Sequence, residues 1–124
     1  MKYSESLKKN KDFRIVYKTG TSNANRYLVM YVRKNELAKN RIGISVSKKV
    51  GNSVVRHHLT RLVREGYRLQ EEKFQCGYDI VIVVRVNGRD CTYFEIERAI
   101  YHLAKKHAIV KERHVEENSS GELS

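Results

Sequence analysis

The residues best suited to bind a ligand lie close together, in the stretch 48–65, which reads KKVGNSVVRHHLTRLVRE. Gly51 and Asn52 are suited to turn the chain into the start of a helix. Free backbone N–H groups and the positive end of the helix dipole attract phosphate at such a start. Lys48, Lys49 and Arg56 add positive charge there. The stretch therefore predicts a clamp for a nucleic-acid backbone.

The helix expected over residues 53–70 has one apolar and one basic side. The apolar side is formed at helical spacing by Val55, Leu59, Leu62, Val63 and Gly66. The opposite side carries His57, Arg61, Arg64 and Arg68. Charged residues on the outer face of a helix usually only interact with water and bind no ligand. Like charges at i and i+4 destabilise a helix, however, unless a ligand of opposite charge binds to them. This side of the helix therefore indicates an anionic partner that is not part of the chain.

Groups that would make the chain an enzyme by itself are scarce. A metal-dependent nuclease needs converging carboxylates, and the first 68 residues contain only four acidic residues beside 17 Lys and Arg. We find no HExxH, GxSxG elbow or glycine-rich phosphate loop. The adjacent His57 and His58 diverge by about 100° on a helix, whereas zinc-binding pairs prefer i and i+4. We expect no catalytic residue and no metal site in the protein.

Composition agrees with a polyanion as the partner. The 124 residues suit a single domain, and the formal net charge is +11. Residues 69–124 hold 8 Lys and Arg against 10 acidic residues, so the binding charge lies in the first half. No apolar run approaches the roughly 18 residues of a membrane span, and the N-terminus is polar, which predicts a cytoplasmic protein without a membrane partner. Cys76 and Cys91 are expected to be ordinary residues.

The periodicity predicts six elements, in the order helix, strand, strand, helix, strand, helix. Asn10 is placed to cap the first helix, and Thr92 with Glu95 forms a capping box at the last helix. We expect a hairpin between the first two strands, and the continuous apolar run YDIVIVV at the centre of the sheet. The expected ranges are a helix at 10–18, strands at 26–33 and 40–47, a helix at 53–70, a strand at 78–84 and a helix from 92 to about 107. Residues 1–111 form one RNA-binding domain, and residues 112–124 are expected to be a disordered tail.

The second strand alternates cleanly, which leaves Arg41, Gly43, Ser45 and Ser47 on one face. Such a polar face with little bulk suits a groove for an extended polyanion, and it suits a solvated sheet face equally well. Phe13, Tyr17 and Tyr31 could stack on unpaired bases, worth roughly 1–3 kcal/mol each. The helical spacing of Phe13 and Tyr17 also fits a place in the hydrophobic core. Periodicity alone favours this role over stacking on bases.

The stretch KVGNSVVRHHLTR at 49–61 resembles the so-called RNR segment of a known family, the protein subunit of bacterial ribonuclease P. Gly51, Asn52, Val54, Arg56 and Arg61 match the family pattern. Departures occur at positions 57, 58 and 60, where His, His and Thr stand in place of the usual Asn, Arg and Lys. LKKNKDFRIVYKTG, the Asn-Arg pair at 25–26 and RIGISVSKK are also similar, so the resemblance spans roughly residues 7–107.

The resemblance implies an α+β two-layer sandwich like the second domain of ribosomal protein S5. Its central sheet would have four strands or fewer, with a left-handed βαβ crossover that ordinary handedness rules would disfavour. It also implies a division of labour within an endoribonuclease. On that resemblance, a catalytic RNA would bind most of the Mg²⁺ and remove the 5′ leader of precursor tRNA. The protein would bind the leader and the RNA in a 1:1 complex, with higher assembly left open, and would lower the Mg²⁺ requirement.

The resemblance assigns residues to two sites. The surface for the RNA subunit comprises Lys49, Gly51, Asn52, Arg56, His57, Arg61, Arg64 and Arg68. The leader cleft, between the first helix and the sheet, comprises Phe13, Tyr17, Tyr31, Ser45 and Lys48.

Two other functions remain open on the sequence. A basic ribosomal-type RNA-binding module fits the composition equally well, and only the segment at 51–61 discriminates against it. A stand-alone metal-dependent ribonuclease would require a carboxylate constellation that we do not find.

Overall fold

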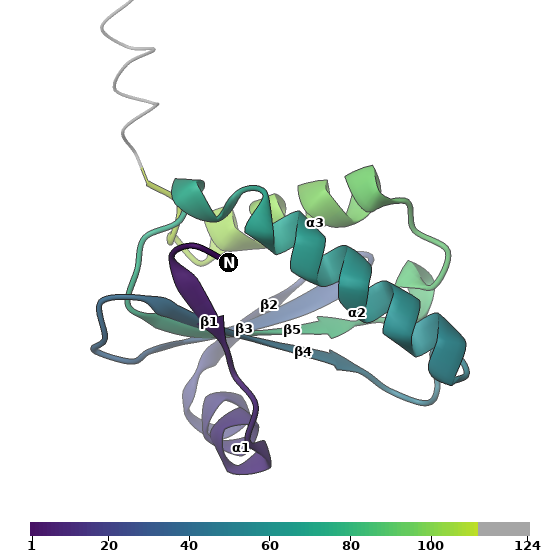
Figure 1. Cartoon of the computed structure of the whole chain (residues 1–124), viewed down its shortest axis with the longest axis horizontal. Helices are drawn as coiled ribbons and strands as arrows, with labels where there is room; N and C mark the ends of the chain where they lie inside the picture. Colours follow the sequence, from purple (N-terminus) through teal and green to yellow (C-terminus); the bar gives the residue numbers. More distant parts are fainter. Residues whose placement is uncertain (112–124) are drawn as a thin grey trace, which may run out of the picture.

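The computed structural model describes residues 1–111, which fold around one mixed β-sheet (Figure 1). The expected tail, residues 112–124, lies outside the described residues. The elements are β1 (Ser4–Ser6), α1 (Asn10–Thr19), β2 (Thr21–Ala24), β3 (Leu28–Lys34), β4 (Asn40–Val46), α2 (Ser53–Arg68), the 3₁₀ turn Glu71–Lys73, β5 (Tyr78–Val84), the 3₁₀ turn Val86–Gly88 and α3 (Tyr93–Lys106).

The sheet has the strand order β1-β4-β5-β3-β2. The apolar β5 lies at its centre, as expected, parallel to β4 and antiparallel to β3. The expected hairpin between the first two predicted strands is wrong, because β5 inserts between β3 and β4. The reason is burial: only a strand that is apolar on both faces can occupy the centre of a sheet covered on both sides.

The sheet has five strands, where four or fewer were expected. The two additional strands, β1 and β2, are short, mostly polar and placed at the two edges. An edge strand buries little, so its sequence carries no alternation of apolar residues that would reveal it. Residues 21–25 lie outside the predicted helices and strands, but most of them form β2, which pairs with β3.

Helices cover both faces of the sheet (Figure 1). The main core lies under α2 and α3 and includes Leu59 and Ile100 with Ile80 and Ile82 of β5. On the other face α1 covers a smaller cluster, in which Val16 packs with Val81 and Leu7. The polar groove expected beside the first helix therefore lies on the thinner side of the molecule.

The connection from β4 through α2 to β5 is the expected left-handed crossover. In Figure 1 the strands lie from front to back in the order β1, β4, β5, β3, β2; β4 and β5 point to the right, and α2 passes above them. The chain runs to the right along β4, returns to the left above the sheet through α2, and then enters β5, which lies behind β4. This path is a left-handed turn. The α+β class and this crossover are confirmed.

The helix ends follow from capping chemistry. The side chain of Asn52 accepts a hydrogen bond from the backbone N–H of Val55 at 3.0 Å, so it caps α2. Thr92 and Glu95 form the predicted capping box of α3. The predicted cap of the first helix is wrong: Asn10 is already helical, and Lys9 occupies the cap position without a side-chain hydrogen bond.

Candidate nucleic-acid interface

A groove of about 590 Å³ runs between α1 and β4 on the thinner face of the sheet. Phe13, Tyr17 and Ser45, three of the five residues predicted for the leader cleft, line it. The groove is also lined by residues that the sequence analysis did not assign to it, Lys8, Asn10 and Arg14 among them. The signal that could have identified them is their closeness to Phe13 in the sequence, with Asn10 and Arg14 on the same helix and Lys8 just before it. The groove thus combines aromatic rings with cationic and hydrogen-bonding side chains, as a strand of unpaired nucleotides requires.

Gly43 sets how closely α1 approaches the sheet. A Cβ atom at this position would lie 2.6 Å from Cζ of Phe13 and 3.2 Å from Cδ2 of Leu7. The Phe13 ring can therefore approach the backbone of β4 this closely only because residue 43 has no side chain. This contact explains why the polar face of the second predicted strand carries so little bulk.

The other two predicted cleft residues lie near the groove but do not line it. Tyr31, on β3, is half-buried and packs edge to face against Tyr17 with ring centroids 4.9 Å apart. It therefore orients Tyr17, whose side chain is exposed. Lys48 is exposed in the connection between β4 and α2, beyond the end of the strand.

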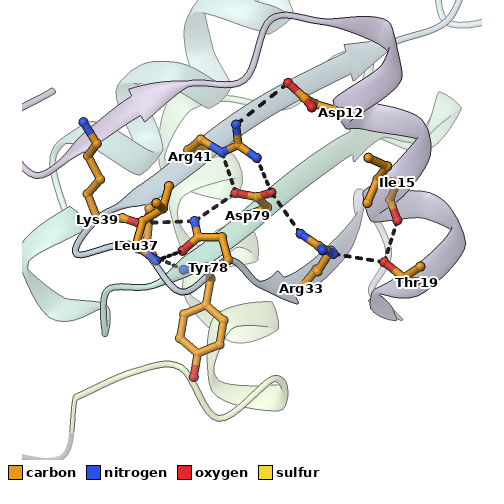
Figure 2. A network of polar contacts seen from close by, with 11 residues as sticks. Asp12, Ile15, Thr19, Arg33, Leu37, Lys39, Arg41, Tyr78 and Asp79 are labelled. Carbon is orange, nitrogen blue, oxygen red and sulfur yellow. Dashed lines mark hydrogen bonds and ion pairs between the residues drawn. The ribbon is translucent and has the colours of Figure 1, made fainter.

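A polar network closes one end of this face of the sheet (Figure 2). Asp79 is only 1% exposed and accepts hydrogen bonds from Nε and Nη2 of Arg41 at 2.8 and 2.7 Å. Asn35 donates a further bond to Asp79 at 2.9 Å. Burial alone would raise the pKa of Asp79, but the bonds from Arg41 and Asn35 outweigh it and hold the pKa below its ordinary value.

The same network reaches α1. Nη1 of Arg41 lies 3.8 Å from a carboxylate oxygen of Asp12, and Nε of Arg33 donates to the hydroxyl of Thr19 at 3.1 Å (Figure 2). Both ends of α1 are thereby tied to the sheet. The sequence does not reveal this network, because its members are far apart in the chain and only the register of β3, β4 and β5 brings them together.

The predicted surface for the RNA subunit lies on the opposite face, on α2. Leu59, Val63 and Gly66 are buried as expected, while His57, Arg61 and Arg64 are exposed. Arg68 is exposed too, but it forms an ion pair with Glu65 at 2.6 Å. Among residues 1–111, Arg61 and Arg64 take part in no ion pair, so these two charges are available to an anion.

The start of α2 is held in a fixed shape. Nε of Arg56 donates to the carbonyl oxygen of Gly51 at 3.2 Å, which leaves the terminal nitrogens of this half-buried guanidinium group for other partners. A Cβ atom on Gly51 would lie 2.7 Å from Cγ1 of Val55, so a side chain is excluded there. Lys49 is exposed beside this turn. The structure thus brings Lys49, Gly51, Asn52 and Arg56 together at one helix start.

Other chemistry finds little support in the part of the chain that the structure describes. Residues 1–111 contain no group of three or more His, Cys, Asp and Glu side chains that could hold a metal ion. Burial raises the pKa of the Cys91 thiol to about 11, so it is a poor nucleophile at neutral pH. None of the described helices is both long and apolar enough to cross a membrane.

Comparison with known proteins identifies the family. The family model described as ribonuclease P matches residues 1–108. The ribonuclease P protein component of Lachnoclostridium phytofermentans is 56% identical over 115 residues, which cover 93% of this chain and 99% of the relative. That of Clostridioides difficile is 49% identical over 104 residues, covering 83% and 91%.

Solved structures agree with the sequence matches. The ribonuclease P protein of Staphylococcus aureus superposes with a TM-score of 0.78 at 36% identity, covering 86% of this chain and 97% of that one. The protein from Thermotoga maritima gives a TM-score of 0.76 at 30% identity, covering 82% and 96%. This chain therefore belongs to the ribonuclease P protein family, as the protein component of the bacterial endoribonuclease complex that processes tRNA.

Proposed function

We propose that the protein assists a catalytic RNA in removing the 5′ leader from precursor tRNA by binding two RNA segments on opposite faces of its sheet. The groove between α1 and β4 takes the single-stranded leader, and the basic side of α2 binds the RNA subunit in a 1:1 complex. The observation that carries the proposal is this arrangement: an aromatic groove on one face and unpaired arginines on the other. The complex would act in the cytoplasm.

The leader would be bound by stacking and by backbone contacts. Phe13 and Tyr17 offer ring faces to unpaired bases, and Lys8 and Arg14 lie beside them for the phosphates. Stacking accepts any base, so this mode suits leaders of differing sequence. The contribution of each ring is expected to be roughly 1–3 kcal/mol.

Catalysis would remain with the RNA, which binds most of the Mg²⁺. Residues 1–111 contain no group of three or more His, Cys, Asp and Glu side chains that could hold a metal ion, and Asp79 is engaged by arginine, so we assign the Mg²⁺ to the RNA. The protein's contribution would be electrostatic: its cations reduce repulsion between the RNA subunit and the substrate, so the complex needs less Mg²⁺.

The test is cleavage of a precursor tRNA at low Mg²⁺ by a bacterial ribonuclease P RNA, with and without the protein, and by the protein alone. We expect cleavage only when RNA and protein are both present. Failure to stimulate a well-folded cognate RNA would contradict the proposal, and so would cleavage by the protein alone.

Two variants separate the two surfaces. Phe13→Ala should weaken binding of a precursor with a leader and leave binding of mature tRNA unchanged. Arg61→Ala should weaken binding of the RNA subunit and lower the slope of its salt dependence by about 1. An unchanged slope would show that Arg61 does not contact the RNA subunit. If Phe13→Ala weakened the binding of both tRNAs equally, the groove would not be the binding site of the leader.

A further inference from the structure

A second basic pocket lies where the turn between β2 and β3 meets α3. It is a shallow, open pocket of about 280 Å³, and Arg26, Arg98 and His102 are among the residues that line it. All three side chains are exposed. Neither arginine takes part in an ion pair among residues 1–111. Two guanidinium groups therefore share one pocket without a bound carboxylate.

Glu95 is the only carboxylate among the lining residues, and it is occupied elsewhere. It accepts hydrogen bonds from the backbone N–H of Thr92 at 2.9 Å and from the hydroxyl of Tyr27 at 3.4 Å. The bond from Thr92 is the main reason why the pKa of Glu95 lies below its ordinary value. Its charge acts mainly at the α3 cap and more weakly on Arg98, and with two arginines against one carboxylate the pocket keeps an excess of positive charge.

The turn that carries Arg26 is held rigidly by Asn25. The Asn25 side-chain oxygen accepts from the backbone N–H groups of Tyr27 and Leu28, and its amide nitrogen donates to the carbonyl oxygen of Ala99 on α3 at 3.0 Å. The Arg26 guanidinium lies over the ring of Tyr27, 5.4 Å from its centroid. The Asn-Arg pair of the sequence therefore has two parts: an amide that fixes the turn and a guanidinium that the turn presents to solvent.

Sheet topology places this pocket at the same end of the molecule as the start of α2. The register pairs Val84, the last residue of β5, with Val46 at the end of β4 and with Leu28 at the start of β3. Neighbouring strands lie about 4.8 Å apart, so the β4 and β3 ends are separated by about 10 Å. Arg85, which follows β5, lies between them and donates to the carbonyl oxygen of Asn25 at 2.7 Å.

We propose that this pocket binds a backbone phosphate of the RNA subunit, so that the RNA-binding surface of α2 continues across this end of the sheet to Arg26 and Arg98. The inference rests on the proposed function of α2. A guanidinium group matches the geometry of a phosphate, and two of them can clamp one. The leader is not the ligand, because its groove lies under α1, on the face opposite to α3.

The experiment measures the affinity of the full-length protein for a bacterial ribonuclease P RNA transcript over a series of salt concentrations. Arg26→Ala and Arg98→Ala are compared with Lys34→Ala as a matched control, since Lys34 is an exposed cation at the other end of β3. Each arginine variant should lower the salt slope by about 1, which is about a tenfold loss of affinity at 0.1 M salt. Arg26→Lys should retain most of the slope, and Lys34→Ala should retain all of it.

Arg61→Ala, measured in parallel, distinguishes the possible failures. If Arg61→Ala lowers the slope and the two pocket variants do not, the pocket proposal is overturned and the α2 surface stands. If none of the three variants lowers the salt slope, both the α2 surface and the pocket are excluded as binding sites for the RNA subunit. If the pocket variants weaken only the binding of precursor tRNA to the assembled complex, the ligand is the substrate and the assignment to the RNA subunit is wrong.

Discussion

Replacing Arg41 by alanine should destabilise the fold, because it removes the main partner of a buried carboxylate. Asp79 is 1% exposed, and Arg41 donates two of its hydrogen bonds, at 2.8 and 2.7 Å. In the variant, Asp79 keeps the bond from Asn35 at 2.9 Å and the charge of Arg33 at 3.7 Å. The carboxylate is then only partly compensated in a position that water hardly reaches.

The expected loss is about 3 kcal/mol in the free energy of unfolding. Hydrogen bonds to charged groups contribute about 1.5–3 kcal/mol each, and removing one partner of a buried ion pair costs about 3–5 kcal/mol. The lower end applies here, because the Arg41 side chain is 26% exposed and Arg33 remains nearby. For a domain of this size, the melting temperature should fall by roughly 10 °C.

Urea unfolding followed by circular dichroism measures this loss, with Asp79→Ala and the double variant completing a mutant cycle. The sum of the losses in the two single variants should exceed the loss in the double variant. The difference, which is the coupling free energy between the two side chains, should be about 1–3 kcal/mol. Because the folded-state pKa of Asp79 is lowered from 3.8, its contribution is present above that value and disappears as pH falls through the folded-state pKa. A loss below about 1 kcal/mol, or a coupling near zero, would refute this reasoning.

Three further outcomes are expected. Gly43→Ala should cost about 1–3 kcal/mol of stability and weaken leader binding, because its Cβ meets the Phe13 ring; adding Phe13→Leu should restore part of the stability, and its failure to do so would exclude this contact. Asn52→Ala should cost about 1 kcal/mol through loss of the α2 cap, measured by urea unfolding, whereas Asn52→Asp should be nearly neutral. Burial lowers the pKa of His107 against the opposing bond from Nε2 to the carbonyl oxygen of Met30, so its contribution to stability is lost as pH falls below about 6.5. His107→Gln should therefore reduce the fall in stability between pH 7.5 and 5.5, and an equal fall in both proteins would contradict this.

The sequence was sufficient for features that local chemistry controls. The apolar run of β5 predicted a central strand, and Thr92 with Glu95 predicted the start of α3, because both patterns depend on neighbours a few residues apart. The basic side of α2 followed in the same way from helical spacing. The charge asymmetry and the segment at 51–61 were enough to indicate an RNA partner and the family.

Tertiary structure decided the features that depend on strand order. No local pattern shows that β5 inserts between β3 and β4, since the pairing follows from which strand can be buried on both faces. That insertion brings Arg33, Arg41 and Asp79 into one network. The register also places the start of β3 at the same end of the sheet as the ends of β4 and β5, so the Arg26 pocket and the start of α2 lie at one end of the sheet. The sequence by itself predicted the basic side of α2 and the aromatic residues of α1, and the sheet register determined which side chains lie together, because residues distant in the chain meet only through the packing of the core.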